Sequence, residues 1–415
     1  MNNIALYDII ISLYFKEASL KTSSIKLSIL SLSALCMISM TASAVLADIQ
    51  AYFTGIDSSL VQMILTIPPL LGVVFAFASG PLSMKIPKRK IIIFGLLSGF
   101  SGGAIAFVFG SISIYILLFS SLLIGIAQGI NSTMTMALIA DYFKGDESSA
   151  MMGLQSAFVN GGGMVLAFLA GMLASIQWNY SYLVYLFFIP ALFITLKTLP
   201  KEDPVHEHHF EQSTAAAKLN ATVFFTAFVF FFYGVFQFVF QANISSVVIE
   251  NGFGNASTTG LINTVYSGAG MLTGILFGHI QRIFKKQTLP FALIIVGIGM
   301  GLVVFAGNLS ILFIAAVCGG FALASIMPSG TFIAANAVVP QLSATAIAIV
   351  TASVNLGMFL SPIILNPLSA LLGSGDLKSK YLISAVGLLV LSVIAFIGYN
   401  YLNRPQASSV QNQQM

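Results

Sequence analysis

Long apolar segments separated by short polar ones run along the whole chain. Each segment continues for about 18 residues or more without an Asp, Glu, Lys or Arg, which is enough for an α-helix to cross a bilayer. Twelve such segments occur, at 27–47, 60–79, 91–109, 112–140, 150–175, 178–196, 221–249, 259–281, 289–306, 309–339, 343–373 and 381–402. Strands of a membrane barrel would alternate over about ten residues, whereas these runs are continuous. We therefore predict an all-α membrane protein with twelve transmembrane helices.

The amino-acid composition fits a surface that faces lipid. Hydrophobic residues make up 57% of the 415 residues, charged residues only 7%, and the mean hydropathy is +0.96. A soluble domain carries about 25% charged residues, so this chain has too few to cover a surface in water. The net charge is +4, and the sequence contains no long run of basic residues, which argues against nucleic acid as a partner. Cys36 and Cys318 supply neither a disulfide framework nor the spacing of a metal site.

The positions of Lys and Arg predict the orientation. If the N-terminus is cytoplasmic, fifteen of the 17 basic residues fall on the cytoplasmic side, and only Lys378 and Lys380 fall outside. We expect both termini in the cytoplasm and the protein in the plasma or inner membrane. Residues 26–47 also look like a secretory signal, but the eleven spans that follow favour an uncleaved first helix. Residues 1–24 could form a short helix on the membrane face or be an extension with no role.

Short motifs recur in the two parts of the chain. Gly80-Pro-Leu82, followed by Lys88, matches Gly278-His-Ile280, followed by Lys286. Asn160-Gly-Gly162 matches Asn355-Leu-Gly357, and Gly110–Ile114 matches Gly307–Ile311. The offsets are 198, 195 and 197 residues, and such a repeat indicates two related halves. Halves of this kind pack about a pseudo-two-fold axis, with the substrate site at their interface near mid-membrane.

The chain is therefore divided into five parts. We predict a cytoplasmic N-terminal segment, two six-helix pseudo-symmetric halves, a central loop between them and a cytoplasmic tail. Their expected bounds are 1–24, 25–198, 199–218, 219–402 and 403–415.

One loop carries a family resemblance. Residues 80–90 resemble the signature between helices two and three of the major facilitator superfamily, roughly Gly-x-Leu-x-Asp-Arg-x-Gly-Arg-Arg. The matching residues, which the resemblance places in the gating loop, are Gly80, Leu82, Lys85, Lys88 and Arg89. Met84 stands where the family has the Asp that helps to latch the cytoplasmic gate, and Pro87 replaces the second Gly. We also expect Gly80 to let helix two approach a neighbour closely.

Two further segments resemble patterns of this family. Residues 121–129 are similar to its fourth-helix pattern, with Ser121 in place of the Arg often linked to proton coupling. Gly161–Gly163 and Gly171 resemble weakly the glycine-rich motif of its antiporters, without the central Gly-Pro pair. The resemblance implies a monomeric secondary transporter that works by alternating access, with helices one, four, seven and ten lining the cavity.

Uncharged polar and aromatic side chains mark the candidate substrate site. In the seventh span they recur at three- and four-residue spacing, which places them on one helix face, and the fourth, eighth and tenth spans hold similar residues. The cavity candidates are Gln128, Asn131, Phe230, Tyr233, Gln237, Gln241, Asn263, Tyr266 and Asn336. Such a lining suits an amphipathic, mostly neutral solute. The alternative is that single amides only join helices, at ~0.6 kcal/mol each.

No span contains an Asp, Glu, Lys or Arg. Because ionisable residues within a membrane usually mark ion pathways, proton coupling would depend on Asp48 or Asp141 at the ends of spans one and four. No phosphate-binding Gly-rich loop with Lys-Ser/Thr and no nucleophile–base pair stands out, so we expect neither an ATP-driven pump nor an enzyme. We also expect no cofactor and no metal site. The expected partners are the lipid bilayer, a small-molecule substrate and, where coupling occurs, protons.

Three functions stay open at this point. The first is export or exchange of amphipathic small organic molecules, driven by a proton or other ion gradient. The second is uptake or facilitated diffusion of a neutral nutrient such as a sugar, which the charge-free spans favour. The third is a transporter-like receptor, which would need a large soluble domain that the sequence does not show.

Overall fold

The computed structural model describes residues 23–202, 219–284, 287–372 and 375–402. In these ranges every regular element is a helix. Eleven helices are long and apolar enough to cross a membrane, and the shorter helix Thr288–Val304 makes the twelfth. At 17 residues that helix reaches the lower limit of about 17 for a span. The twelve-helix prediction is confirmed. The predicted segments 1–24, 199–218 and 403–415 lie largely outside the described residues, and the domain bounds stay predictions.

Ten spans are single α-helices. In chain order they are α3 (Ser58–Ser83), α4 (Lys88–Phe109), α5 (Ile114–Tyr142), α6 (Gly145–Ala174), α8 (Ala221–Glu250), α9 (Ala256–Phe284), α10 (Thr288–Val304), α11 (Leu309–Asn336), α12 (Pro340–Leu372) and α13 (Leu377–Leu402).

The first span is broken, where the sequence predicts one plain helix. It is α-helical over 23–34, turns at 35–37, and ends as the 3₁₀-helix η1 (Ile38–Ala44). The short helix α2 (Leu46–Tyr52) follows it. Thr41 Oγ1 donates to Ile38 O at 2.7 Å, a bond to the third residue back that matches the pitch of a 3₁₀-helix. Hydroxyl groups that compete in this way for backbone carbonyls loosen an α-helix.

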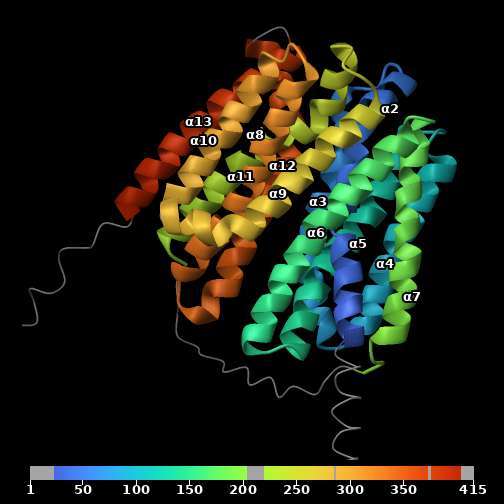
Figure 1. The fold of residues 1–415 in the computed structure, drawn as a ribbon, viewed down its shortest axis with the longest axis vertical. Helices are drawn as coiled ribbons and strands as arrows, with labels where there is room; N and C mark the ends of the chain where they lie inside the picture. The colour runs from blue at the N-terminus through green and yellow to red at the C-terminus, as the bar shows by residue number, and fades with distance from the viewer. Residues whose placement is uncertain (1–22, 203–218, 285–286, 373–374, 403–415) are drawn as a thin grey trace, which may run out of the picture.

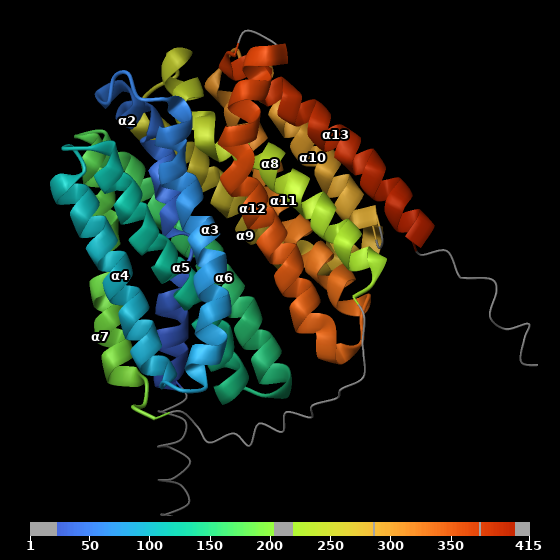
Figure 2. The same cartoon turned by 180° about the vertical axis from the view of Figure 1, so that it is seen from behind.

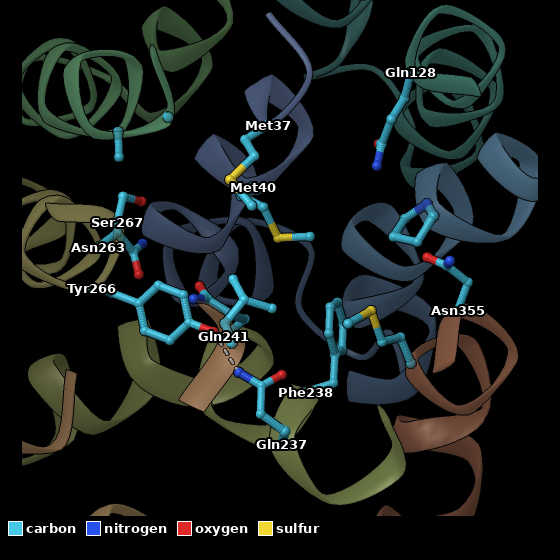
Figure 3. Close-up of a pocket in the computed structure, with 15 residues that line it drawn as sticks. Met37, Met40, Gln128, Gln237, Phe238, Gln241, Asn263, Tyr266, Ser267 and Asn355 are labelled. Atoms are coloured by element: carbon cyan, nitrogen blue, oxygen red, sulfur yellow. Dashed lines mark hydrogen bonds between the residues drawn. The ribbon is translucent and has the colours of Figure 1, made fainter. Parts of the chain in front are cut away.

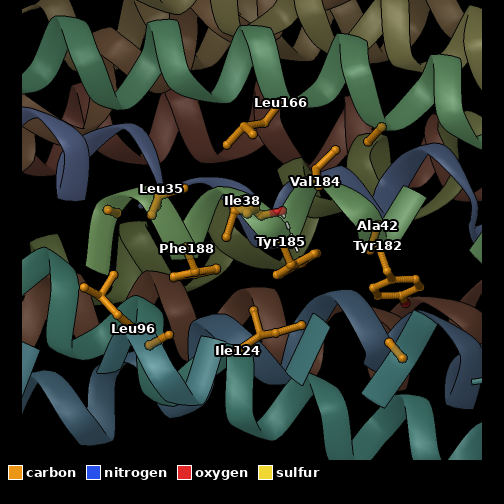
Figure 4. Close-up of a cluster of buried hydrophobic side chains, with 14 of the residues drawn as sticks. Leu35, Ile38, Ala42, Leu96, Ile124, Leu166, Tyr182, Val184, Tyr185 and Phe188 are labelled. Carbon is orange, nitrogen blue, oxygen red and sulfur yellow. Dashed lines mark hydrogen bonds between the residues drawn. The ribbon is translucent and has the colours of Figure 1, made fainter. Parts of the chain in front are cut away.

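The sixth span also begins as a 3₁₀-helix, η2 (Trp178–Phe187), and continues as α7 (Phe188–Thr198). Three residues per turn place every third side chain in one column. The rings of Tyr182, Tyr185 and Phe188 therefore stack, with centroids 5.9 and 6.1 Å apart. Figure 4 shows this column between the first span and α4. Gly99 and Gly103 of α4 lie against Phe188 and Tyr185, at positions where a Cβ would overlap the rings.

The helices form two bundles, coloured blue to green and yellow to red in Figures 1 and 2. Each bundle has its own hydrophobic core, one centred on the first six spans and the other on the last six. Across the interface, α3 packs on α12 and α6 packs on α9. These are the second and eleventh spans and the fifth and eighth, a pattern that a pseudo-two-fold axis between the halves produces.

The repeated Asn-x-Gly motif makes equivalent contacts in both halves. Gly162 of α6 lies against the carbonyl oxygen of Ala34 in the first span, and Gly357 of α12 lies against the carbonyl oxygen of Phe231 in α8. A Cβ at either glycine would collide with this backbone, so both pairs of helices pack as closely as small residues allow. The sequence repeat is therefore also a structural one.

Candidate functional site

A cavity lies between the two halves, near the middle of the helices. Its volume is ≈ 170 Å³. Figure 3 shows side chains from the first span, α5, α8, α9 and α12 pointing into it. The lining comprises Met37, Met40, Pro69, Gln128, Gly163, Ala167, Gln237, Phe238, Gln241, Asn263, Tyr266, Ser267, Leu323, Asn355 and Met358. None of these side chains is charged, and five of them carry an amide.

The cavity brings together five of the nine side chains that the sequence suggested. They are Gln128 of α5, Gln237 and Gln241 of α8, and Asn263 and Tyr266 of α9. On α8 the two glutamines are four residues apart and share one face, as the spacing predicts. The structure thus supports the assignment of this face, while a role in substrate binding stays a prediction for all nine residues.

The other four side chains lie outside the cavity. Asn131 is buried beside Gly95 of α4. Phe230 fills the space over Gly330 of α11, and Tyr233 is fully buried in the core of the second half. Asn336 ends α11 and donates to Phe332 O in its own helix at 2.8 Å. On α8 the line of polar and aromatic residues extends beyond the cavity. Its first two members, Phe230 and Tyr233, therefore pack between helices.

Hydrogen bonds orient part of the lining. Gln237 Nε2 donates to Tyr266 Oη at 2.7 Å, and Ser39 Oγ donates to Gln128 Oε1 at 2.8 Å. The Tyr266 ring stacks on Phe240 with centroids 5.8 Å apart. These contacts fix the tyrosine and two of the amides from several sides.

Other polar atoms of the lining lack a partner among the described residues. They are Gln241 Oε1 and both polar side-chain atoms of Asn263, and all three are buried. A buried polar group without a hydrogen bond costs about 1–3 kcal/mol. These atoms can therefore bind a group that offers both donors and acceptors.

Sequence reasoning missed several lining residues. Met37 and Met40 belong to the irregular part of the first span, and Phe238 lies next to a predicted glutamine. Nothing in the sequence distinguishes them from core residues. Asn355 carries a signal through the repeat, but the glycine beside it suggests a packing role.

Comparison with known families decides the identity of the chain. A sequence model described as Major Facilitator Superfamily matches it twice, over residues 27–247 and 226–414. The chain belongs to the major facilitator superfamily. The first match runs from the first span into α8 and the second from α8 through α13, so the two overlap within α8. A search of curated protein sequences returned no match.

Solved structures of other transporters have the same fold as this major facilitator protein. A mutant of the nucleoside transporter NupG superposes with a TM-score of 0.74 at 12% identity, covering 90% of this chain and 99% of that one. A bacterial homologue of the human lysosomal transporter Spinster, inward-facing and unoccupied, gives 0.69 at 14%, covering 92% and 96%. The peptide transporter PepTSo, of the POT family, gives 0.70 at 12%, covering 91% and 98%. At these identities the likeness shows the fold alone.

Hydrogen bonds join the halves of this major facilitator at the end that contains α2 and the start of α13. We term it the opposite end, because it lies away from residues 80–90. Gln62 Nε2 of α3 donates to Asn243 Oδ1 of α8 at 2.8 Å. Asn366 Nδ2 of α12 donates to Ser59 Oγ at 2.9 Å and to Gln62 Oε1 at 3.1 Å. These four residues form an uncharged amide network that holds the second, seventh and eleventh spans together.

The first span continues this closure at the opposite end. Ser43 Oγ donates to the carbonyl oxygen of Gln241 at 2.5 Å, and Ser245 Oγ donates to that of Ala44 at 3.0 Å. Both bonds connect the first half to α8. At this end the two halves are thus joined by hydrogen bonds to backbone oxygens as well as by bonds between side chains.

The other end of this major facilitator, termed the basic end, contains the residues that the family resemblance predicts for the gating loop. Lys88 Nζ lies 2.8 Å from Asp141 Oδ2 of α5, and Arg89 Nη2 donates to Leu196 O of α7 at 2.7 Å. These contacts fasten α4 to neighbours in its own half. Gly80, Leu82 and Lys85 are exposed at and after the last turn of α3. No heavy atom lies within 4 Å of a Cβ placed on Gly80, so the close approach that we expected there is not made.

The two carboxylates proposed for coupling have different surroundings. Asp141 is paired with Lys88 at the basic end. Asp48 lies in α2 at the opposite end, and its buried Oδ2 has no partner among the described residues. Burial raises the pKa of the Asp48 carboxyl above its ordinary value. The surroundings of Asp48 thus favour its protonated form.

Proposed function

We propose that this protein carries amphipathic, uncharged small organic molecules across a cell membrane by alternating access, as a monomer with both termini in the cytoplasm. In this proposal it exports them or exchanges them, driven by a proton or other ion gradient. The observation that carries the proposal is the cavity between the halves, where unpartnered amide atoms lie among Met and Phe side chains.

The lining accounts for the kind of solute. A charged substrate would leave water without finding a counter-ion in this cavity, and an unpaired buried charge is costly. Gln241 and Asn263 offer a hydrogen-bond donor and acceptors to a polar group, while Met40, Phe238 and Met358 offer apolar contact. A solute with one polar and one apolar side satisfies both sets.

The contacts between the halves fit alternating access. In this state the amide network closes the opposite end. A change of state would break the three hydrogen bonds of this network. None of them joins charged groups, and such hydrogen bonds contribute about 0.5–1.5 kcal/mol each. Solute binding and the driving ion together can offset a cost of this size.

A second candidate function is uptake or facilitated diffusion of a neutral nutrient such as a sugar. The absence of charged side chains from the cavity favours it, because a facilitator needs no ionisable group along its path. A transporter-like receptor would use the same fold without moving a solute.

Transport into proteoliposomes separates these functions. We would measure uptake of a panel of neutral and amphipathic compounds with and without an imposed pH gradient. Gradient-dependent movement of an amphipathic compound is the expected result. Movement that ignores the gradient would establish the facilitator instead, and binding without movement would favour the receptor.

A further inference from the structure

A second cavity lies on the other side of α6. Its volume is ≈ 500 Å³, and we term it the membrane-side groove. Every residue that lines it is apolar or glycine: Ala34, Leu35, Ala157, Phe158, Gly161, Gly162, Met164, Val165, Leu166, Phe187 and Met271. They come from the first span, α6, η2 and α9, along the seam between the fifth and eighth spans.

The groove is continuous with the membrane-facing surface. Phe158, Val165 and Phe187 at its rim are 40%, 49% and 45% exposed. In a protein of this family such apolar side chains, in the middle of spanning helices, contact acyl chains rather than water. Molecules dissolved in the bilayer can therefore enter the groove directly.

Only a thin wall separates the groove from the polar cavity. Gly161 and Gly162 line the groove, whereas the next residue, Gly163, lines the cavity. Over these three residues α6 has no side chains, so the wall is little more than a helix backbone, about 2.3 Å in radius. These glycines belong to the run that weakly resembles the antiporter motif.

Methionine side chains lie against two glycines of this wall and against one glycine of α9 that faces it. From the position of a Cβ on each glycine, Met37 Sδ lies 3.4 Å from Gly163, Met271 Sδ lies 3.7 Å from Gly161, and Met164 Sδ lies 3.3 Å from Gly268 of α9. The three methionines come from three different spans. Methionine has three flexible bonds and no branch, so it adapts readily to a new neighbour. Rotation of these side chains would open a passage at the seam between α6 and α9, beside the backbone wall.

We propose that the membrane-side groove binds the alkyl chain of an amphiphilic substrate whose uncharged head lies in the polar cavity. The substrate would then enter from the bilayer, between α6 and α9, rather than from water. This inference rests on the proposed function and narrows its substrate to single-chain amphiphiles. A lipid of the surrounding bilayer is the competing occupant, but it would make no use of the unpartnered amides beyond the wall.

Photo-crosslinking tests the occupant. The probe is an alkyl glucoside with a diazirine near the end of its chain, present in vesicles at a fraction that leaves them intact. We expect adducts on residues 157–166 and around Met271, and we expect them to disappear when an excess of unlabelled alkyl glucoside is added. Labelling by a two-chain diazirine phospholipid that this competitor does not displace would assign the groove to bilayer lipid and overturn the proposal.

A variant with a matched control sharpens the test. Gly161→Leu fills the groove without meeting backbone, since only Met271 lies within 4 Å of the new Cβ. Displacing two methylenes of the chain at ~0.8 kcal/mol each should lower labelling about tenfold. Gly153→Leu lies on the same helix outside the groove, with nothing within 4 Å of its Cβ, and should label like the parent. Equal labelling of both variants would refute the groove as the binding site.

Transport by the same variants separates this inference from the proposed function. Gly161→Leu should still carry a short-chain glucoside of the same head group while losing the long-chain one. If the parent carries only the short-chain compound, the membrane-side route is wrong and the proposed function stands. If the parent carries neither compound nor any other member of the panel, the proposed function itself fails.

Discussion

The cavity contains two kinds of polar side chain. Gln237 donates a hydrogen bond to Tyr266 at 2.7 Å, which holds both side chains in place without a ligand. Gln241 and Asn263 keep buried atoms that no described residue satisfies. Preorganised groups beside unsatisfied ones are typical of a binding site, because the ligand supplies the missing hydrogen bonds.

Truncating Gln237 should impair transport without loss of folded protein. Gln237→Ala removes the donor to Tyr266 and one polar group of the lining, and a hydrogen bond of this kind contributes about 0.5–1.5 kcal/mol. We expect KM to rise about three- to tenfold, measured in proteoliposomes against the amount of purified monomer. Asn131→Ala is the control, since this buried amide lies outside the cavity. If Gln237→Ala lowers only the yield of folded protein, the side chain is structural.

Asp48 should control the response to a pH gradient. Since burial raises its pKa, the protonated carboxyl stabilises the fold fully below the ordinary carboxyl pKa, and this contribution is lost as the pH rises through the raised value. Asp48→Asn mimics the protonated form, so we expect transport to continue but to lose its dependence on the gradient. Asp141→Asn should reduce the yield through loss of the Lys88 pair and keep the pH response. A variant of Asp48 that still follows the gradient would exclude this residue as the proton site.

At the scale of elements, the sequence predicts the helices well and their irregularities poorly. The ends of most spans lie within a few residues of the predicted ones, because exclusion of charge from lipid defines them. The breaks in the first and sixth spans have no such signal, since apolar composition is the same in a 3₁₀-helix and an α-helix. The missed cavity residues Met37 and Met40 lie in or beside one of these breaks, which explains why the helical spacing did not select them.

The ring column of η2 depends on small residues in α4. Gly103→Leu places a Cβ where Tyr185 already lies, and such overpacking typically costs 1–3 kcal/mol. We expect a lower thermal unfolding temperature and less folded protein, measured by size-exclusion chromatography after heating. Gly301→Leu is the control, since that spanning-helix glycine has nothing within 4 Å of its Cβ. Unchanged stability of Gly103→Leu would mean that the column is not required for packing.

At the scale of the whole molecule, the sequence repeat indicates two halves but not how they meet. In the amide network, Ser59 and Gln62 lie three residues apart on α3, but Asn243 and Asn366 are too far along the chain for spacing to relate them to this pair. Only the packing of α3 on α12 and the approach of α8 bring them together. The first half and the second half therefore meet at the opposite end through side chains that the sequence alone gave no reason to select.

Breaking this network should shift the protein towards the state that is open at the opposite end. Asn366→Leu removes two hydrogen bonds between the halves, at 2.9 and 3.1 Å, and contributions of about 0.5–1.5 kcal/mol each shift a two-state equilibrium by about tenfold. Spin labels on Ile112→Cys and Leu372→Cys, both exposed at this end, would report the change as a longer distance, with Cys36 and Cys318 replaced beforehand. Asn251→Leu is the control, because among the described residues the side-chain amide of Asn251 bonds only to Val247 O of α8. Identical distance distributions for Asn366→Leu and the parent would mean that other contacts hold the halves closed, and the gate would then lie in the backbone bonds made by Ser43 and Ser245.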